Sequence, residues 1–132
     1  MALLVGAALA IAIGRFATFS GLDRDRAFYP TVMIVIALLY DLFAVIGGST
    51  QVLLVESLIA LVFVVAAIWG FRSSLWLVVV ALVAHGSFDL VHGKMIANSG
   101  VPAWWPQFCF AYDIVAAAYL AWLIKRERLR AI

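Results

Sequence analysis

The sequence predicts an all-α membrane protein, folded as a bundle of five transmembrane helices. The 132-residue chain is 67% hydrophobic and only 12% charged, whereas soluble domains are about half apolar and a quarter charged. Its apolar residues form five runs, each near the length of about 17–25 residues that a helix needs to cross a bilayer. Short segments rich in polar residues, glycine or proline separate the runs. We therefore expect one transmembrane domain over residues 1–132.

The first predicted span covers residues 2–19. Gly6, Ala10 and Gly14 follow one another at four-residue spacing, which is typical of a helix face that packs closely against another helix. The run has no Lys or Arg at its start and no cleavage site followed by a soluble domain, so a retained helix is favoured over a signal peptide. A polar loop at residues 20–26 follows.

Residues with special backbone preferences mark the ends of the other spans. Pro30 opens the second span, because proline is well placed in a first helical turn. Gly47 and Gly48 end it, Ser49 or Thr50 caps the third span, and Pro106 opens the fifth. The predicted spans are residues 30–46, 51–69, 75–97 and 106–124, with a charged tail at residues 125–132.

The distribution of basic residues predicts the orientation. With five spans, all of the nine Lys and Arg residues except Lys94 fall on the side of the C-terminal tail. Cytoplasmic segments of membrane proteins carry an excess of Lys and Arg, so we expect the N-terminus outside and the C-terminus in the cytoplasm. These basic residues form no patch with aromatic residues, which argues against a nucleic-acid partner.

The fourth span carries an unusual polar face. His85, Asp89 and His92 occur at positions i, i+4 and i+7 of an apolar run, which places them within about 60° of one another on a helix. Ionisable groups are costly inside a bilayer, so their presence there indicates a function.

Acidic residues of four spans lie at a similar depth. At about 1.5 Å per residue, the buried ionisable groups lie roughly 8–18 Å from the outer ends of their spans. Because the second to fifth spans each bring one acid to this layer, we expect a single site in the outer half of the membrane. The predicted metal ligands are His85, Asp89, His92, Asp41, Asp113 and Glu56.

The composition of these six predicted ligands favours a divalent metal ion, and the candidates are iron, zinc and manganese. Four carboxylates in a low dielectric require a counter-charge, and two histidines with four carboxylates match the ligand count of dinuclear helical bundles. Only one acid–histidine pair at i, i+3 is present, Asp89 and His92, so a single zinc or iron ion held by His85, His92 and one or two carboxylates is nearly as consistent. Iron or manganese indicates redox chemistry on a lipid-soluble substrate, and zinc indicates hydrolysis.

Two interpretations without a metal stand beside this one. The same acid–histidine network can conduct protons or ions, or bind a ligand, as part of a membrane subunit. Alternatively, the polar groups only fix helix packing. The sequence leaves open whether the chain forms a homo-oligomer or joins a larger membrane complex. The residues expected to surround the site are Tyr40, Tyr112, Cys109 and Ser57.

The fourth span reads Trp76-x8-His85-x2-Phe88-Asp89-x2-His92. This pattern resembles the His-x3-Asp-x2-His helix of an uncharacterised family of small bacterial multi-pass membrane proteins. The similarity extends more loosely over residues 28–125, including the Phe-Tyr-Pro-Thr start of the second span. The resemblance supports the fold and the importance of His85, Asp89 and His92. We expect the protein in the bacterial inner membrane. The family has no assigned activity.

Overall fold

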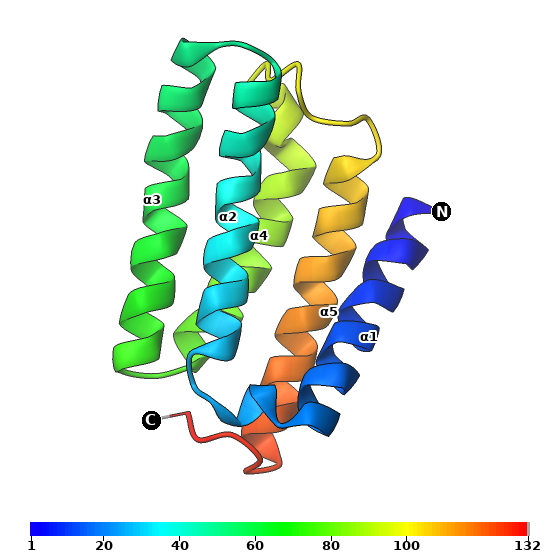
Figure 1. Ribbon diagram of the computed structural model, residues 1–132, viewed down its shortest axis with the longest axis vertical. Helices are drawn as coiled ribbons and strands as arrows, with labels where there is room; N and C mark the ends of the chain where they lie inside the picture. Colours follow the sequence, from blue (N-terminus) through cyan, green and yellow to red (C-terminus); the bar gives the residue numbers. More distant parts are fainter. Residues whose placement is uncertain (132) are drawn as a thin grey trace.

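The computed structural model describes residues 1–131, which form five long α-helices and one short 3-10 helix, η1 (Figure 1). No strand occurs among these residues. All five α-helices are long and apolar enough to cross a membrane, so the all-α, five-helix prediction is confirmed. The elements are α1 (Ala2–Ser20), η1 (Leu22–Arg24), α2 (Phe28–Ile46), α3 (Thr50–Arg72), α4 (Trp76–Met95) and α5 (Trp105–Lys125).

The helix ends follow the predicted signals with small differences. The Ser49 hydroxyl accepts a hydrogen bond from the Val52 N–H at 3.2 Å and caps α3. Helix α2 begins two residues before Pro30, so the proline lies in the first turn. N–H groups of the first turn have no partner within the helix, so the N–H that proline lacks costs no hydrogen bond there. Helix α3 continues past the predicted end at residue 69 to Arg72, and the Ser73 N–H still donates to the Trp69 carbonyl.

The helices pack in an order that leaves one side of α2 uncovered. Helix α4 packs against α2, α3 and α5, and α1 lies on the outer side of α5 (Figure 1). Within the described residues, α2 packs against α3 and more sparsely against α4, but not closely along α1 or α5. One hydrophobic core joins α2, α3, α4 and α5.

Polar contacts close the end of the bundle that holds the C-terminal tail. The Thr18 hydroxyl donates to the buried Asp23 carboxylate at 2.5 Å and lies 2.6 Å from the Tyr119 hydroxyl. The tail folds back, since the Leu75 N–H donates to the Ala131 carbonyl at 2.8 Å and Leu129 is buried. Residue 132 of the predicted tail lies outside the described residues.

The small-residue face of α1 packs directly on α5. Gly6, Ala10 and Gly14 are buried, and a Cβ atom added at Gly6 would overlap the backbone carbonyl oxygen of Phe108. Backbone atoms cannot move aside as a side chain can, so α1 would have to shift away from α5.

Gly6→Ala is therefore expected to lower the free energy of unfolding by about 1–3 kcal/mol, the usual cost of overpacking. Reversible denaturation in detergent measures it. Gly93→Ala is the matched control, because a Cβ at Gly93 in α4 meets no atom within 4 Å. A Gly6→Ala protein as stable as Gly93→Ala would contradict the close α1–α5 contact.

Candidate metal centre

Five of the six predicted metal ligands are almost completely buried inside the bundle, and only Asp41 is partly exposed. The structure does not gather all six at one point. It places His85, Asp89 and Asp113 together, and it pairs His92 with Glu56. The predicted neighbour Cys109 joins the first group.

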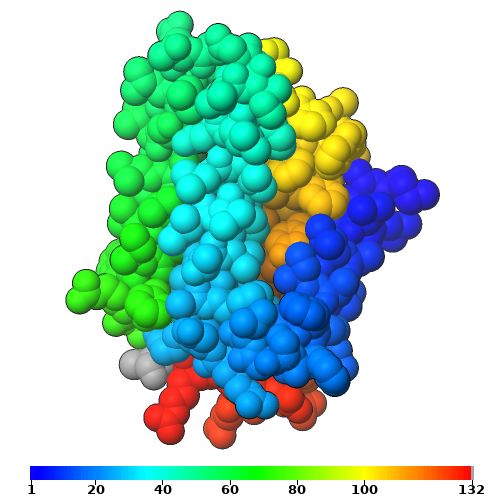
Figure 2. Space-filling model, viewed as in Figure 1, coloured from blue at the N-terminus to red at the C-terminus, as the bar shows by residue number. Residues whose placement is uncertain are grey.

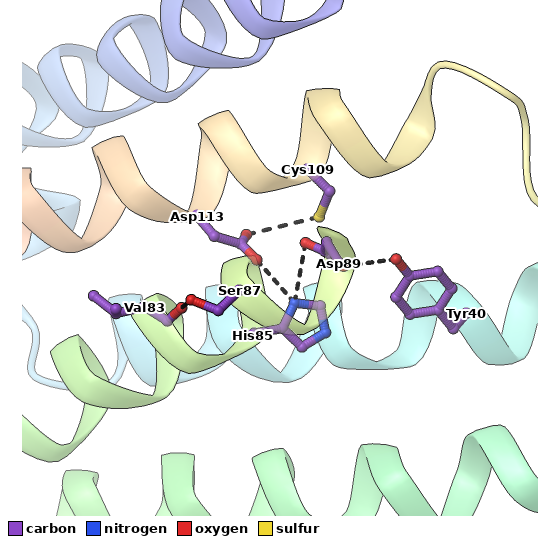
Figure 3. A network of polar contacts seen from close by, with 7 residues as sticks. All are labelled: Tyr40, Val83, His85, Ser87, Asp89, Cys109 and Asp113. Atoms are coloured by element: carbon purple, nitrogen blue, oxygen red, sulfur yellow. Dashed lines mark hydrogen bonds and ion pairs between the residues drawn. The ribbon is translucent and has the colours of Figure 1, made fainter. Parts of the chain in front are cut away.

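The first group is a compact cluster between α4 and α5 (Figure 3). His85 Nδ1 lies 2.8 Å from Asp113 Oδ2 and 3.6 Å from Asp89 Oδ2. The Cys109 thiol donates to Asp113 Oδ1 at 3.7 Å. One possible ligand atom from each residue lies within 4.8 Å of the others. We call His85, Asp89, Cys109 and Asp113 the four-residue cluster.

Helix geometry and one glycine bring these four side chains together. His85 and Asp89 are one turn apart on α4, and Cys109 and Asp113 are one turn apart on α5, so each pair projects from a single helix face. Between the helices lies Gly86, where an added Cβ would be only 3.1 Å from the Asp113 Cβ. The absence of a side chain at Gly86 therefore lets α5 bring Asp113 to His85.

One carboxylate oxygen of the cluster lacks a hydrogen-bond donor. Asp89 is fully buried, and its Oδ1 accepts a 2.6 Å hydrogen bond from the Tyr40 hydroxyl. Its Oδ2 accepts none from the described residues, although it faces His85 Nδ1. A buried acceptor without a partner costs about 1–3 kcal/mol, and more when charged. Since no Lys or Arg side chain of residues 1–131 pairs with the cluster, a cation would satisfy this oxygen.

The second group lies nearer the α4–α5 loop. His92 Nε2 is 2.7 Å from Glu56 Oε2, and the Asn98 side-chain amide donates to the same oxygen at 2.7 Å. Asn98 comes from a loop that sequence reasoning treated only as a connection. Asn98 lies about one helical turn beyond the end of α4, and this spacing is the sequence signal that could have placed it near His92. A cavity of about 380 Å³ lined by His92 and Asn98 opens beside this pair.

Tyr40 connects the two groups. Its hydroxyl bonds to Asp89, and its ring stacks on the His92 imidazole with centroids 3.8 Å apart and planes inclined by 11°. Asp41, the next residue, is turned about 100° further around α2. It therefore faces α3, where the Ser57 hydroxyl donates to its carboxylate at 3.0 Å. Tyr112 lines a groove between α1, α2 and α5.

Ser87 does not face the cluster. It is exposed, and its hydroxyl donates to the Val83 carbonyl of its own helix at 2.9 Å (Figure 3). A serine nucleophile paired with His85 therefore has no geometric support here.

If a metal ion occupies the cluster, Tyr40→Phe is expected to weaken its binding about 10–100-fold, because the hydroxyl orients Asp89. Competition with a fluorescent zinc chelator measures the change. Tyr112→Phe is the control, since the Tyr112 hydroxyl makes no hydrogen bond with the cluster. Equal zinc affinity in the two variants would show that Tyr40 does not support the site.

No protein-family model matches the chain, and none of the curated proteins or solved structures compared with it does. The class of protein therefore follows from the fold and the cluster alone. The chain is an all-α helical bundle whose five helices are apolar enough to cross a membrane, as in integral membrane proteins. It holds a buried cluster of one histidine, two aspartates and one cysteine.

Proposed function

We propose that the protein is a membrane metalloenzyme that holds one divalent metal ion at the four-residue cluster and acts on a lipid-soluble substrate. The carrying observation is the buried Asp89 Oδ2, which accepts no hydrogen bond from the described residues and lies 3.6 Å from His85 Nδ1, beside three other possible ligand atoms. Buried charges are normally paired or bound to metal ions. A metal ion at this position would give the oxygen its partner and balance the carboxylates.

The donor types favour zinc over iron or manganese. The cluster offers one imidazole nitrogen, one sulfur and two carboxylates, and zinc accepts nitrogen, sulfur and oxygen ligands in tetrahedral sites. Manganese suits carboxylate, carbonyl and water ligands, whereas a cysteine sulfur selects Cu(I), zinc or iron–sulfur clusters. Among the described residues no hydrogen bond joins the second group directly to the cluster, and Tyr40 and Phe88 lie between them, which favours one metal ion over two.

The chemistry that zinc would supply is hydrolysis. Bound zinc polarises a carbonyl oxygen or lowers the pKa of a bound water to about 7. Four protein ligands would complete a tetrahedral zinc site, so a water could bind only by replacing one of them. Cys109 lies in the wall of a groove as well as in the cluster, so we assign it as the ligand that a water would replace.

Elemental analysis of the full chain, purified in chelator-washed detergent and reloaded with equimolar zinc, iron and manganese, tests the proposal. We expect about one zinc per chain to survive gel filtration. A chain that retains none of the three metals would overturn the metal centre. Retention of iron or manganese instead of zinc would overturn the hydrolytic chemistry.

A second candidate is a proton relay without a metal. It is favoured by the close contacts that run from Asp113 through His85 to Asp89 and Tyr40, which stacks on His92. Acid–histidine chains of this kind carry protons in pumps. Proton flux in liposomes containing the metal-free protein tests it, and flux no greater than that of empty liposomes would exclude it.

We also propose that the C-terminal end of the bundle faces the cytoplasm of a bacterium. The end with the tail, the η1 loop and the α3–α4 turn carries nearly all the Lys and Arg residues, and Lys94 lies at the opposite end. A fluorescent protein fused to the C-terminus is expected to fluoresce in bacterial inner membranes. Alkaline phosphatase fused there should be inactive, and an active fusion would reverse the orientation.

A further inference from the structure

A groove of about 760 Å³ runs along the uncovered side of α2. In Figure 2 the surface is hollowed between α2 (cyan) and α1 (blue), with α5 (orange) recessed between them. On the α2 wall the lining residues run from Phe28 to Leu39, a helix length of about 16 Å. The volume falls within the range of about 300–1,000 Å³ that is usual for small-molecule sites.

The groove has an apolar length and a distinct end near the cluster. Val32, Val35 and Ile36 line its middle, whereas Trp105 and Cys109 lie at the N-terminal end of α5. Cys109 belongs to the four-residue cluster. A molecule in the groove therefore meets a possible metal ligand at that end.

Trp105 carries one of three buried side-chain atoms that lack a hydrogen-bond partner among the described residues, and the other two are Asp41 Oδ1 and Asp89 Oδ2. Trp105 is only 9% exposed, and its indole Nε1–H, a donor that cannot also accept, has no acceptor among residues 1–131. Leaving a buried donor without an acceptor costs about 1–3 kcal/mol. A ligand oxygen at this end would provide the acceptor that the protein does not.

We infer that this groove binds a long-chain fatty acyl compound, with its carbonyl oxygen at Trp105 and Cys109 and its hydrocarbon chain along α2. This deepens the proposed function, on which it rests, by giving the substrate class. A carbonyl oxygen supplies the acceptor that Trp105 lacks, and an acyl carbon beside the cluster is the group that a zinc-bound water would attack. With an acyl ester, the water oxygen would bond to the acyl carbon, the ester C–O bond would break, and the alcohol would leave with a proton from the water. The remaining apolar length accommodates a flexible chain.

The depth of the groove agrees with this orientation. Trp105 begins α5 at one end of the bundle, the position of the membrane interface, where tryptophans gather. Phe28 marks the far end of the α2 wall, where the groove is also lined by Leu22 and Asp25, and Leu39 lies nearer Trp105. An acyl chain with its carbonyl at the interface and its methyl end deeper has the arrangement of a membrane lipid. If a second copy of this chain occupied the groove instead, a helix of about 10–12 Å diameter would have to fit there. The groove therefore suits a single acyl chain better than a second copy.

Native mass spectrometry of the delipidated full chain tests the inference, with palmitic acid and geranylgeraniol as probes. We expect one palmitic acid per chain and at least tenfold weaker binding of geranylgeraniol. Val35→Trp should weaken palmitate binding at least tenfold by filling the groove. Leu38→Trp is the matched control, because Leu38 is similarly exposed on α2, at 45% against 54% for Val35, and lies outside the groove.

A second pair of variants tests the carbonyl position. Trp105→Phe removes the N–H and should weaken palmitate binding about fivefold, the equivalent of one hydrogen bond. Trp104→Phe, at an exposed neighbour outside the groove, should leave it unchanged. The inference would be overturned if Trp105→Phe and Trp104→Phe changed palmitate affinity equally, or if Val35→Trp and Leu38→Trp did. Tighter binding of geranylgeraniol than of palmitic acid would also overturn it.

Zinc content measured on the same samples separates this inference from the metal centre. One palmitate per chain without zinc would refute the metal centre and leave the groove assignment standing. Zinc without palmitate would refute the groove assignment alone.

Discussion

His85→Ala is expected to leave the protein folded but to abolish zinc binding. His85 provides the only nitrogen of the four-residue cluster and contacts both aspartates. Residues that merely support metal ligands contribute about 10–100-fold to affinity, so loss of a ligand should reduce affinity by at least about 100-fold. Elemental analysis after gel filtration and competition with a zinc chelator measure the loss.

Ser87→Ala is the matched control for this experiment. Ser87 lies on the same helix, two residues away, and is exposed with its hydroxyl bonded to its own backbone. It should retain full zinc content. Cys109→Ser, which leaves no large cavity, should also weaken zinc binding and keeps the test valid if His85→Ala misfolds. Zinc retained at wild-type affinity in both cluster variants would contradict the metal centre.

Glu56→Ala should produce the largest loss of stability, about 3–5 kcal/mol. Glu56 is 1% exposed, and its Oε2 is the partner of both His92 and Asn98. Removing one member of a buried pair leaves the other without compensation, and losses of this size are typical. Reversible unfolding in detergent, in the presence of a chelator, measures it without the contribution that bound metal makes to stability.

Two further variants show whether the buried pair causes the effect. Asp41→Ala removes a carboxylate whose contact is the Ser57 hydroxyl, so a smaller loss of about 1 kcal/mol is expected. Glu56→Gln keeps an oxygen acceptor at the same place and should fall between the two Ala variants. A Glu56→Ala protein no less stable than Asp41→Ala would show that the His92–Glu56 contact does not stabilise the fold.

Much of the fold could be predicted from residue order alone. A bilayer has a fixed thickness, and backbone groups inside it must bond within their own segment, so long apolar runs become helices. Local signals then mark the ends approximately: Ser49 caps α3, and Pro30 and Pro106 lie in the first turns of α2 and α5. The close α1–α5 contact also follows the predicted glycine spacing at Gly6 and Gly14.

The candidate site could be predicted in composition more than in arrangement. Depth along a helix follows from residue number, and four of the five long helices do bring a buried or partly buried acid to the interior. Depth does not determine the direction of a side chain around the helix axis relative to its neighbours. That direction separates Asp41, which faces Ser57, from Tyr40, which reaches Asp89.

By itself, the sequence therefore determined five apolar helices, their ends, and a polar face on the fourth, because these depend on local composition and spacing. Only the tertiary structure decided that Cys109 joins His85, Asp89 and Asp113, while His92 pairs with Glu56. Those contacts depend on which helices are neighbours and how each is rotated. Two features of the packing determine which helices are neighbours and how they face one another. They are the close approach of α4 and α5 at Gly86 and the open side of α2.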